Sequence, residues 1–141
     1  MKIVGRARDW SFRLAWTGRF RRGRNRPWMP CEAWQYNNSL AVARIMHLRI
    51  RFGRVLPVIG RDTYLDGKGR MLIKLLDRVV VGDGRGDEFD LGELVTYLND
   101  ALLLAPSMLL TPHVSWSAVD ADSFTVTLTD RAHTVSAALC R

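Results

Sequence analysis

Residues 62 to 110 constrain the fold most, because glycine-punctuated strands give way there to one amphipathic helix. Asp66-Gly67 predicts a hairpin turn, since this dipeptide tolerates the positive φ that tight turns require. Apolar runs over 71–76 and 79–81 predict a strand after that turn, with a bulge at Asp77-Arg78. Because the runs are nearly continuous, we expect this strand to be central and buried on both faces.

The helix that follows is predicted over residues 90–104. Asp90 is placed to cap its amino terminus, and Glu93 completes the capping-box spacing three residues later. Pro106 ends the helix, because proline lacks the amide donor and restricts the residue before it. Residues 107–110 predict one further short turn of helix. One face of the main helix carries apolar residues at helical spacing: Leu91, Leu94, Val95, Leu98 and Leu102.

The remaining segments predict extended structure. Alternating apolar residues over 9–17 and 43–52 predict strands with one buried face, and 55–59 with 64–65 predict shorter extended pieces. Two prolines confine any strand near residue 30 to a sheet edge or to its first residues. From residue 114 onward, three runs separated by turns predict an antiparallel meander.

These elements together predict an α+β fold. We expect a curved, mostly antiparallel, half-barrel-like sheet of about seven to nine strands, with the 90–104 helix packed on its concave face. The length of 141 residues and the apolar content of 48% suit a single domain that spans residues 1–141.

The formal charge of +7 is unevenly distributed. Residues 1–54 hold 13 Lys or Arg against 2 acidic residues, whereas residues 55–141 hold 8 against 12. The basic excess includes a patch flanked by Phe20 and Trp28, which consists of Arg19, Arg21, Arg22, Arg24 and Arg26. This patch suits an anionic partner such as a lipid head group or a membrane surface. The simpler alternative is solvated arginines that discourage aggregation, and the lack of a recognisable nucleic-acid motif argues against nucleic acid.

Cys31 and Cys140 stand 109 residues apart and fit no metal-binding or redox spacing. We therefore expect two reduced thiols in a cytoplasmic protein. The sequence has no run of 18 apolar residues and no signal-peptide pattern. Neither a membrane span nor a secretory leader is predicted, although peripheral contact with a membrane stays open.

Two patterns in the loop before the helix resemble ligand sites without meeting their requirements. Gly82, Gly84 and Gly86 have the wrong spacing for a dinucleotide turn, and the acidic residues beside them would repel a pyrophosphate. The acidic cluster within 83–90 lacks the closing Glu of a calcium loop and is better explained by solvated carboxylates near a helix amino terminus. The three histidines are scattered and form no triad. We predict no catalytic residue, no metal site and no cofactor.

Three groups of residues form a larger signature along the chain. They are Trp28, Pro30 and Gln35; Asp62, Tyr64, Gly67, Gly69 and Met71; and Glu93, Leu94, Val95, Tyr97, Leu98, Pro106, Leu109 and Leu110, followed by Trp116. With this signature the chain resembles an uncharacterised bacterial family, the domain of unknown function 6544, over about residues 16–139.

The resemblance implies a fold and a class of ligand. Members are similar in pattern to half-barrel lipoprotein-carrier folds, in which a curved antiparallel sheet wraps an inner helix and encloses an apolar ligand. Members usually have Phe in place of Cys31, and they continue with further strands past the point where this chain ends. The resemblance therefore implies a pocket that is incomplete or is finished by another chain.

Three functional hypotheses follow. The leading one is a non-enzymatic module that binds an apolar or amphiphilic, lipid-like molecule between sheet and helix, lined by Trp34, Tyr64, Leu94, Leu98, Leu102 and Trp116. An alternative places Asp62, Tyr64 and Glu93 in one cleft as a hydrolase or isomerase site. The simpler interpretation of Asp62 and Tyr64 is a turn carboxylate and a half-buried packing residue. A third hypothesis is an interaction protein that forms a homodimer through its terminal strand.

Overall fold

The computed structural model describes residues 10–53 and 55–140, and within these ranges the chain is an α+β fold with two antiparallel sheets. The first sheet has six strands in chain order: β1 (Ser11–Phe20), β2 (Met29–Asn38), β3 (Ala43–Phe52), β4 (Leu56–Leu65), β5 (Lys68–Leu75) and β6 (Val79–Arg85). The helices α1 (Asp87–Leu104) and η1 (Pro106–Leu109) lead into the second sheet, which consists of β7 (Val114–Ala118), β8 (Ser123–Asp130) and β9 (His133–Cys140). The fold class, the strand number and the carboxyl end of the predicted helix are confirmed.

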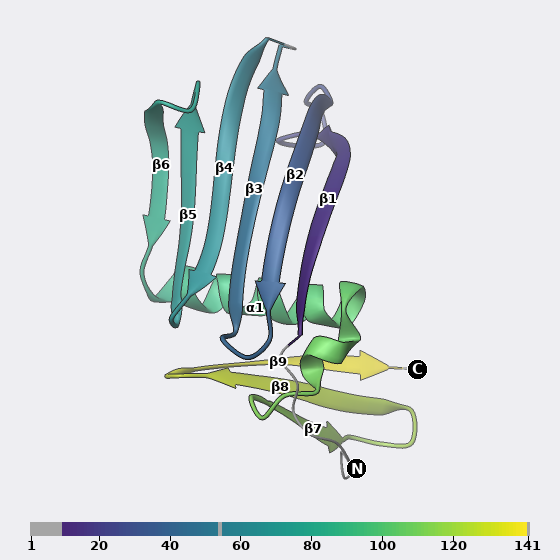
Figure 1. The fold of residues 1–141 in the computed structure, drawn as a ribbon. Helices are drawn as coiled ribbons and strands as arrows, with labels where there is room; N and C mark the ends of the chain where they lie inside the picture. Colours follow the sequence, from purple (N-terminus) through teal and green to yellow (C-terminus); the bar gives the residue numbers. More distant parts are fainter. Residues whose placement is uncertain (1–9, 54, 141) are drawn as a thin grey trace.

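The helix α1 lies between the two sheets and crosses one end of the six-stranded sheet (Figure 1). It contacts β4, β5 and β6 on one side and β9 on the other. The strands therefore wrap the helix from two sides without closing into a barrel. The terminal strand β9 is an edge of the three-stranded sheet.

The main core forms where α1 meets both sheets. Tyr64, Leu94 and Leu98 are at most 1% exposed, and Val126 and Leu128 of β8 pack into the same cluster. The buried face of α1 consists of Asp90, Glu93, Leu94, Tyr97, Leu98 and Ala101. This stripe differs from the predicted one, because Leu91 and Val95 lie at its side and are 41% and 43% exposed.

The amino terminus of α1 differs from the capping-box prediction. The helix begins at Asp87, with Gly86 as its N-cap at a φ of 108°. The Asp90 carboxylate accepts hydrogen bonds from the Gly69 amide at 2.7 Å and from the Lys68 ammonium at 2.9 Å. Asp90 therefore attaches the helix to β5 instead of capping it, because a partner distant in sequence competes for its oxygens.

The first turn of α1 packs in close contact with β5 and β6 at two glycines. A Cβ on Gly69 would overlap the Phe89 carbonyl oxygen, and a Cβ on Gly84 would overlap the Phe89 ring. Only glycine therefore allows the first turn of α1 to lie this close to β5 and β6.

The prediction of a central strand over residues 71–81, buried on both faces, is wrong. The apolar run over 71–81 does not form one buried strand, because Leu76 and Asp77 adopt positive φ angles of 55° and 56° and turn the chain into β6. Strand β6 is an edge of its sheet, and Val79, Val80 and Val81 are 57%, 54% and 59% exposed.

The proline-containing segment forms an inner strand. β2 pairs with both β1 and β3, and Pro30 is tolerated because the ladder with β3 starts one residue later, at Cys31. The two short pieces predicted over 55–65 form one continuous strand, β4.

Candidate functional site

The six-stranded sheet has an inner face, which α1 covers at one end, and an opposite outer face. Residues paired across antiparallel strands point to the same face. Under the helix, the inner face carries polar residues in the aligned rows Asn37, Arg44 and Tyr64, and Gln35, Met46 and Asp62. The polar character of the inner face is confined to this end.

Beyond the helix, the next three rows of the inner face contain no charged side chain. We call these twelve residues the open half: Trp16, Ala33, Leu48 and Ile73; Cys31, Ile50, Val58 and Leu75; and Phe20, Met29, Phe52 and Leu56. Gly60 and Gly82 lie in the first of these rows, beside Leu48 and Ile73. The open half is a continuous apolar surface on five neighbouring strands.

The open half has its own small cluster, separate from the main core. Met29, Cys31 and Ile50 are 7%, 7% and 9% exposed and pack with Leu48. All four belong to β2 and β3, so this cluster is built from one sheet without a second layer. Its surroundings are accessible, since Trp16, Phe52 and Leu56 are 38%, 48% and 42% exposed. Of the twelve residues of the open half, Trp16, Phe20, Phe52 and Leu56 are exposed. A patch of exposed apolar residues of this kind is a candidate binding face.

A buried ionic cluster closes the other end of the inner face. Arg44 is 3% exposed, and its Nη1 and Nε lie 2.8 Å from Glu93 Oε2 and Asp100 Oδ2, respectively. Gln35 Nε2 donates to the same Asp100 oxygen at 2.6 Å. These bonds join β2 and β3 to two turns of α1.

Burial perturbs the carboxyl groups of this cluster. The pKa of Glu93 is raised to about 7 by burial and by the neighbouring carboxylate of Asp62, against the opposing effect of Arg44. Burial also raises the pKa of Asp62, again opposed by Arg44. Because three carboxyl groups meet a single guanidinium, the cluster holds a proton on Glu93 up to neutral pH.

Tyr64 does not join Asp62 and Glu93 in a shared polar cleft. Its hydroxyl donates to Asp130 Oδ2 of β8 at 2.8 Å, and the ring is fully buried. Burial and this hydrogen bond raise the pKa of Tyr64 above its ordinary value. Tyr64 therefore connects the two sheets, while Asp62 and Glu93 remain the polar pair of the predicted cleft.

The residues predicted to line a site between sheet and helix are mostly core residues. Tyr64, Leu94 and Leu98 belong to the main core, and Leu102 and Trp116 pack against it while partly buried. Trp34 lies on the outer face, because it alternates with the inward-facing Ala33 and Gln35. There its ring stands 5.7 Å from the His47 ring. The space between helix and sheet is thus occupied by these side chains themselves.

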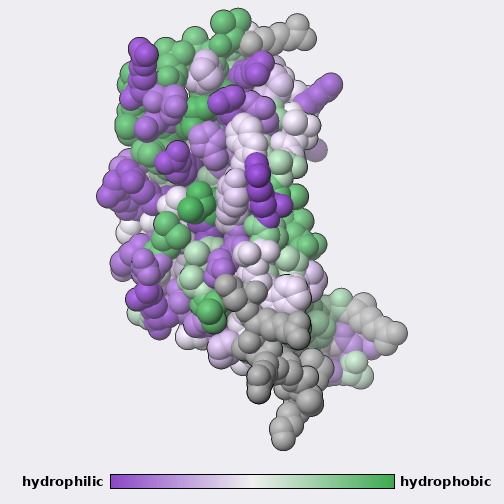
Figure 2. All heavy atoms as spheres, viewed as in Figure 1, coloured by the Kyte–Doolittle hydropathy of each residue, from purple (hydrophilic) through white to green (hydrophobic). Residues whose placement is uncertain are grey.

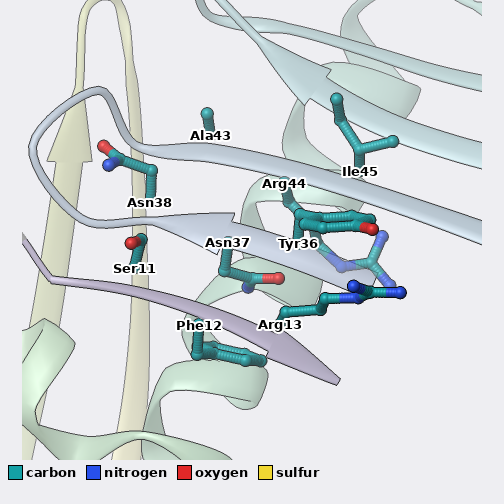
Figure 3. A pocket seen from close by; sticks show the side chains of 9 residues that line it. All are labelled: Ser11, Phe12, Arg13, Tyr36, Asn37, Asn38, Ala43, Arg44 and Ile45. Carbon is teal, nitrogen blue, oxygen red and sulfur yellow. The ribbon is translucent and has the colours of Figure 1, made fainter. Parts of the chain in front are cut away.

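The outer face carries shallow hollows bordered by arginine. One of about 340 Å³ opens over β1, β2 and β3, where Arg13 lies 5.5 Å from the centroid of the Tyr36 ring (Figure 3). A second, of about 370 Å³, is bordered by Arg19, Arg49 and Arg51. Burial lowers the pKa of His47, and the charges of Arg61 and Arg49 lower it further.

The predicted arginine patch lies at the connection between β1 and β2. Arg21, Arg22, Arg24 and Arg26 are exposed there, and Arg19 is exposed on β1. The Arg21 guanidinium stacks 4.5 Å from the centroid of the Trp28 ring, so cation and aromatic are adjacent, as the sequence pattern suggested.

Within the acidic cluster before the helix, Asp83 is paired with two arginines. Asp83 accepts bonds from Arg70 at 2.7 Å and from Arg85 at 2.9 Å, and these partners lower its pKa. Across residues 10–53 and 55–140, no group of three or more His, Cys, Asp or Glu side chains is arranged to hold a metal ion. Cys31 is a buried free thiol, whose pKa is raised by burial, and Cys140 is an exposed one.

The sequence reasoning did not identify Arg44, Gln35 and Asp100 as site residues. A signal for Arg44 was available, because it continues the alternation of Met46, Leu48 and Ile50 and must therefore point inward. An arginine on a buried face requires carboxylate partners, and these come from the helix.

Comparison with known proteins identifies a family for this chain without assigning an activity. The model of a family of unknown function (DUF6544) matches residues 1–140. Searches among curated proteins and solved structures gave no match. Within the part of the chain that the structure describes, no helix has both the length and the apolar character required to cross a membrane.

Proposed function

This chain belongs to the DUF6544 family, and we propose that it is a non-enzymatic module that binds an apolar or amphiphilic, lipid-like molecule on the open half. The observation that carries the proposal is the run of three aligned rows without a charged side chain, next to a helix that covers only the polar end. A face of this composition is stabilised by anything that removes it from water.

The dimensions of the open half suit an acyl chain. Five strands spaced about 4.8 Å apart give a width of roughly 20 Å, and the exposed rims of Trp16 and Leu56 lie on β1 and β4. Each methylene removed from water contributes about 0.8 kcal/mol. We therefore expect affinity to rise with chain length in a series of fatty acids.

We propose that the ligand binds to the inner face of the sheet beside α1 and not beneath it. The six residues first expected to line the site either form the main core or, like Trp34, face the other way. The ligand class is unchanged, whereas its position moves to strands whose inner face α1 does not cover.

The test is titration of the full chain with a dansyl-labelled fatty acid. Trp16 and Trp34 offer a matched pair of tryptophans on opposite faces of adjacent strands. We expect Trp16→Ser to weaken binding about tenfold, because it removes part of a large apolar contact, and Trp34→Ser to change it less than about twofold. Equal loss in both variants, or no saturable binding by the wild type, refutes the proposal.

A second candidate function rests on the pKa of Glu93, which is raised to about 7. A carboxyl group with this pKa, beside Asp62, is suited to general acid or base catalysis near neutral pH. With Tyr64 bonded to Asp130, this enzyme would depend on Asp62 and Glu93 alone. Hydrolysis of a panel of nitrophenyl esters that disappears in Glu93→Gln would support it, and identical rates in both proteins would exclude it for these substrates.

A further inference from the structure

Three turns meet at the end of the six-stranded sheet that is remote from α1, and we call this the far end (Figure 1). They join β1 to β2, β3 to β4, and β5 to β6. Large apolar side chains are exposed around them: Phe20, Trp28, Phe52, Val55, Leu56, Leu76, Val79, Val80 and Val81. Val55 is 82% exposed and the valines of β6 are more than half exposed. Figure 2 shows hydrophobic residues gathered at this end of the molecule.

The same turns carry a strong positive charge. Exposed arginines within the described ranges are Arg21, Arg22, Arg24 and Arg26 in the first turn, Arg51 next to the second and Arg78 in the third. Asp77 is the acidic residue that accompanies them in these turns. Apolar tips and cations thus occupy one surface.

We infer that the far end docks on the surface of an anionic phospholipid bilayer. Aliphatic tips can enter the boundary between head groups and acyl chains, tryptophan prefers that boundary, and arginines are attracted to anionic head groups. Trp28 and the Arg21 guanidinium stacked on it combine both preferences in one contact.

The aliphatic character of the exposed side chains favours a bilayer over a nucleic acid as the partner. A nucleic-acid strand would be drawn to cations interleaved with accessible aromatic faces. Of the seven large apolar side chains exposed at the second and third turns, however, only Phe52 is aromatic, and the other six are aliphatic: Val55, Leu56, Leu76, Val79, Val80 and Val81. A charged polymer gains nothing from aliphatic tips, whereas a bilayer does.

The docking surface is continuous with the open half. Phe20, Met29, Phe52 and Leu56 form the last row of the open half and also border the turns of the far end. A docked molecule would bring this row against the acyl layer. The inference stands independently of ligand binding, because the turns carry their apolar and basic residues whether or not the open half is occupied.

The experiment is co-sedimentation of the full chain with vesicles of phosphatidylcholine alone and of phosphatidylcholine mixed with phosphatidylglycerol. We expect binding to the mixed vesicles, weakened by salt, and little binding to the neutral ones. Arg22→Gln with Arg24→Gln should weaken binding about 30-fold, at the usual contribution of each basic residue near an anionic surface. Removal of two exposed cations elsewhere, Arg13→Gln with Arg61→Gln, is the matched control and should have less than about a threefold effect.

A second pair of variants tests the apolar tips. Val55 and Leu103 are 82% and 81% exposed, at the far end and at the end of α1. Val55→Asp should weaken vesicle binding about tenfold or more, because it adds a repelled charge and removes an inserted side chain, while Leu103→Asp should not. Equal effects of the two, equal binding to neutral and mixed vesicles, or tighter binding to a single-stranded oligonucleotide than to mixed vesicles would each overturn the inference.

Failure of membrane docking can be separated from failure of ligand binding. The Arg22→Gln, Arg24→Gln protein should bind dansyl fatty acid in vesicle-free solution within about twofold of the wild type. The Trp16→Ser protein should sediment with mixed vesicles as the wild type does. Loss of both activities in either variant contradicts the assignment of two surfaces.

Discussion

Because of Glu93, the free energy of unfolding of the protein should decrease as the pH rises from mildly acidic to mildly basic values. The pKa of Glu93 is about 7 in the folded protein against an ordinary value of 4.5. The folded state therefore binds more protons than the unfolded state between these values, and the free energy of unfolding decreases as pH rises through this window. A difference of about 2.5 pKa units corresponds to roughly 3 kcal/mol.

The substitution that isolates this effect is Glu93→Gln. Glutamine resembles the protonated acid, and its carbonyl oxygen can still accept the Arg44 bond that is 2.8 Å long in the wild type. We expect the free energy of unfolding of the wild type to fall by about 2.5 kcal/mol more than that of the variant between about pH 5 and pH 8. His47, whose pKa is lowered, acts in the opposite direction in both proteins and cancels in the comparison.

Urea unfolding followed by circular dichroism at the two pH values measures the difference. Glu88→Gln is the control, because Glu88 is an exposed acid in the first turn of the same helix. Equal losses of stability with rising pH in the wild type and in Glu93→Gln would contradict the raised pKa of Glu93. So would a Glu88→Gln variant that removes as much of the pH dependence as Glu93→Gln does.

Two further predictions concern packing. Gly69→Ala should destabilise the fold by about 3 kcal/mol or more, because the added methyl group would overlap the Phe89 backbone. The control is Gly60→Ala, where the added methyl group has room and should cost less than about 1 kcal/mol. Thermal unfolding of the two variants measures the difference. Tyr64→Phe should cost about 1–3 kcal/mol by leaving the Asp130 carboxylate without its donor; a loss within about 0.5 kcal/mol of zero in urea unfolding would contradict the bridging role of this hydroxyl.

Local periodicity predicted the elements whose partners lie nearby in sequence. The alternation over 43–52 gave β3 with its observed bounds, and Pro106 marked the end of α1. The meander after residue 114 is likewise a chain of short antiparallel connections. In each case, neighbouring residues carry the information that determines the structure.

Predictions failed where a distant partner decided the outcome. Asp90 has the sequence signature of a cap, but the Gly69 amide and Lys68 take its oxygens. The sequence predicted that the valines of β6 are buried, but no seventh strand pairs beside β6 in the described sheet. For the candidate site, the proposed ligand class came from the family resemblance and the distributed aromatic residues, whereas the proposed position depends on how far α1 reaches across the sheet, which no local pattern encodes.

The separation of the small β2–β3 cluster from the main core divides single strands into parts of unequal local stability. In β2, Asn37 lies beneath the helix, whereas Met29 belongs to the cluster without a second layer. Amide protons near Asn37 should exchange with solvent only through global unfolding, and those near Met29 through smaller, more frequent openings. A bound acyl chain would supply the missing layer and slow the second group, so that hydrogen exchange along one strand reports occupancy without any label.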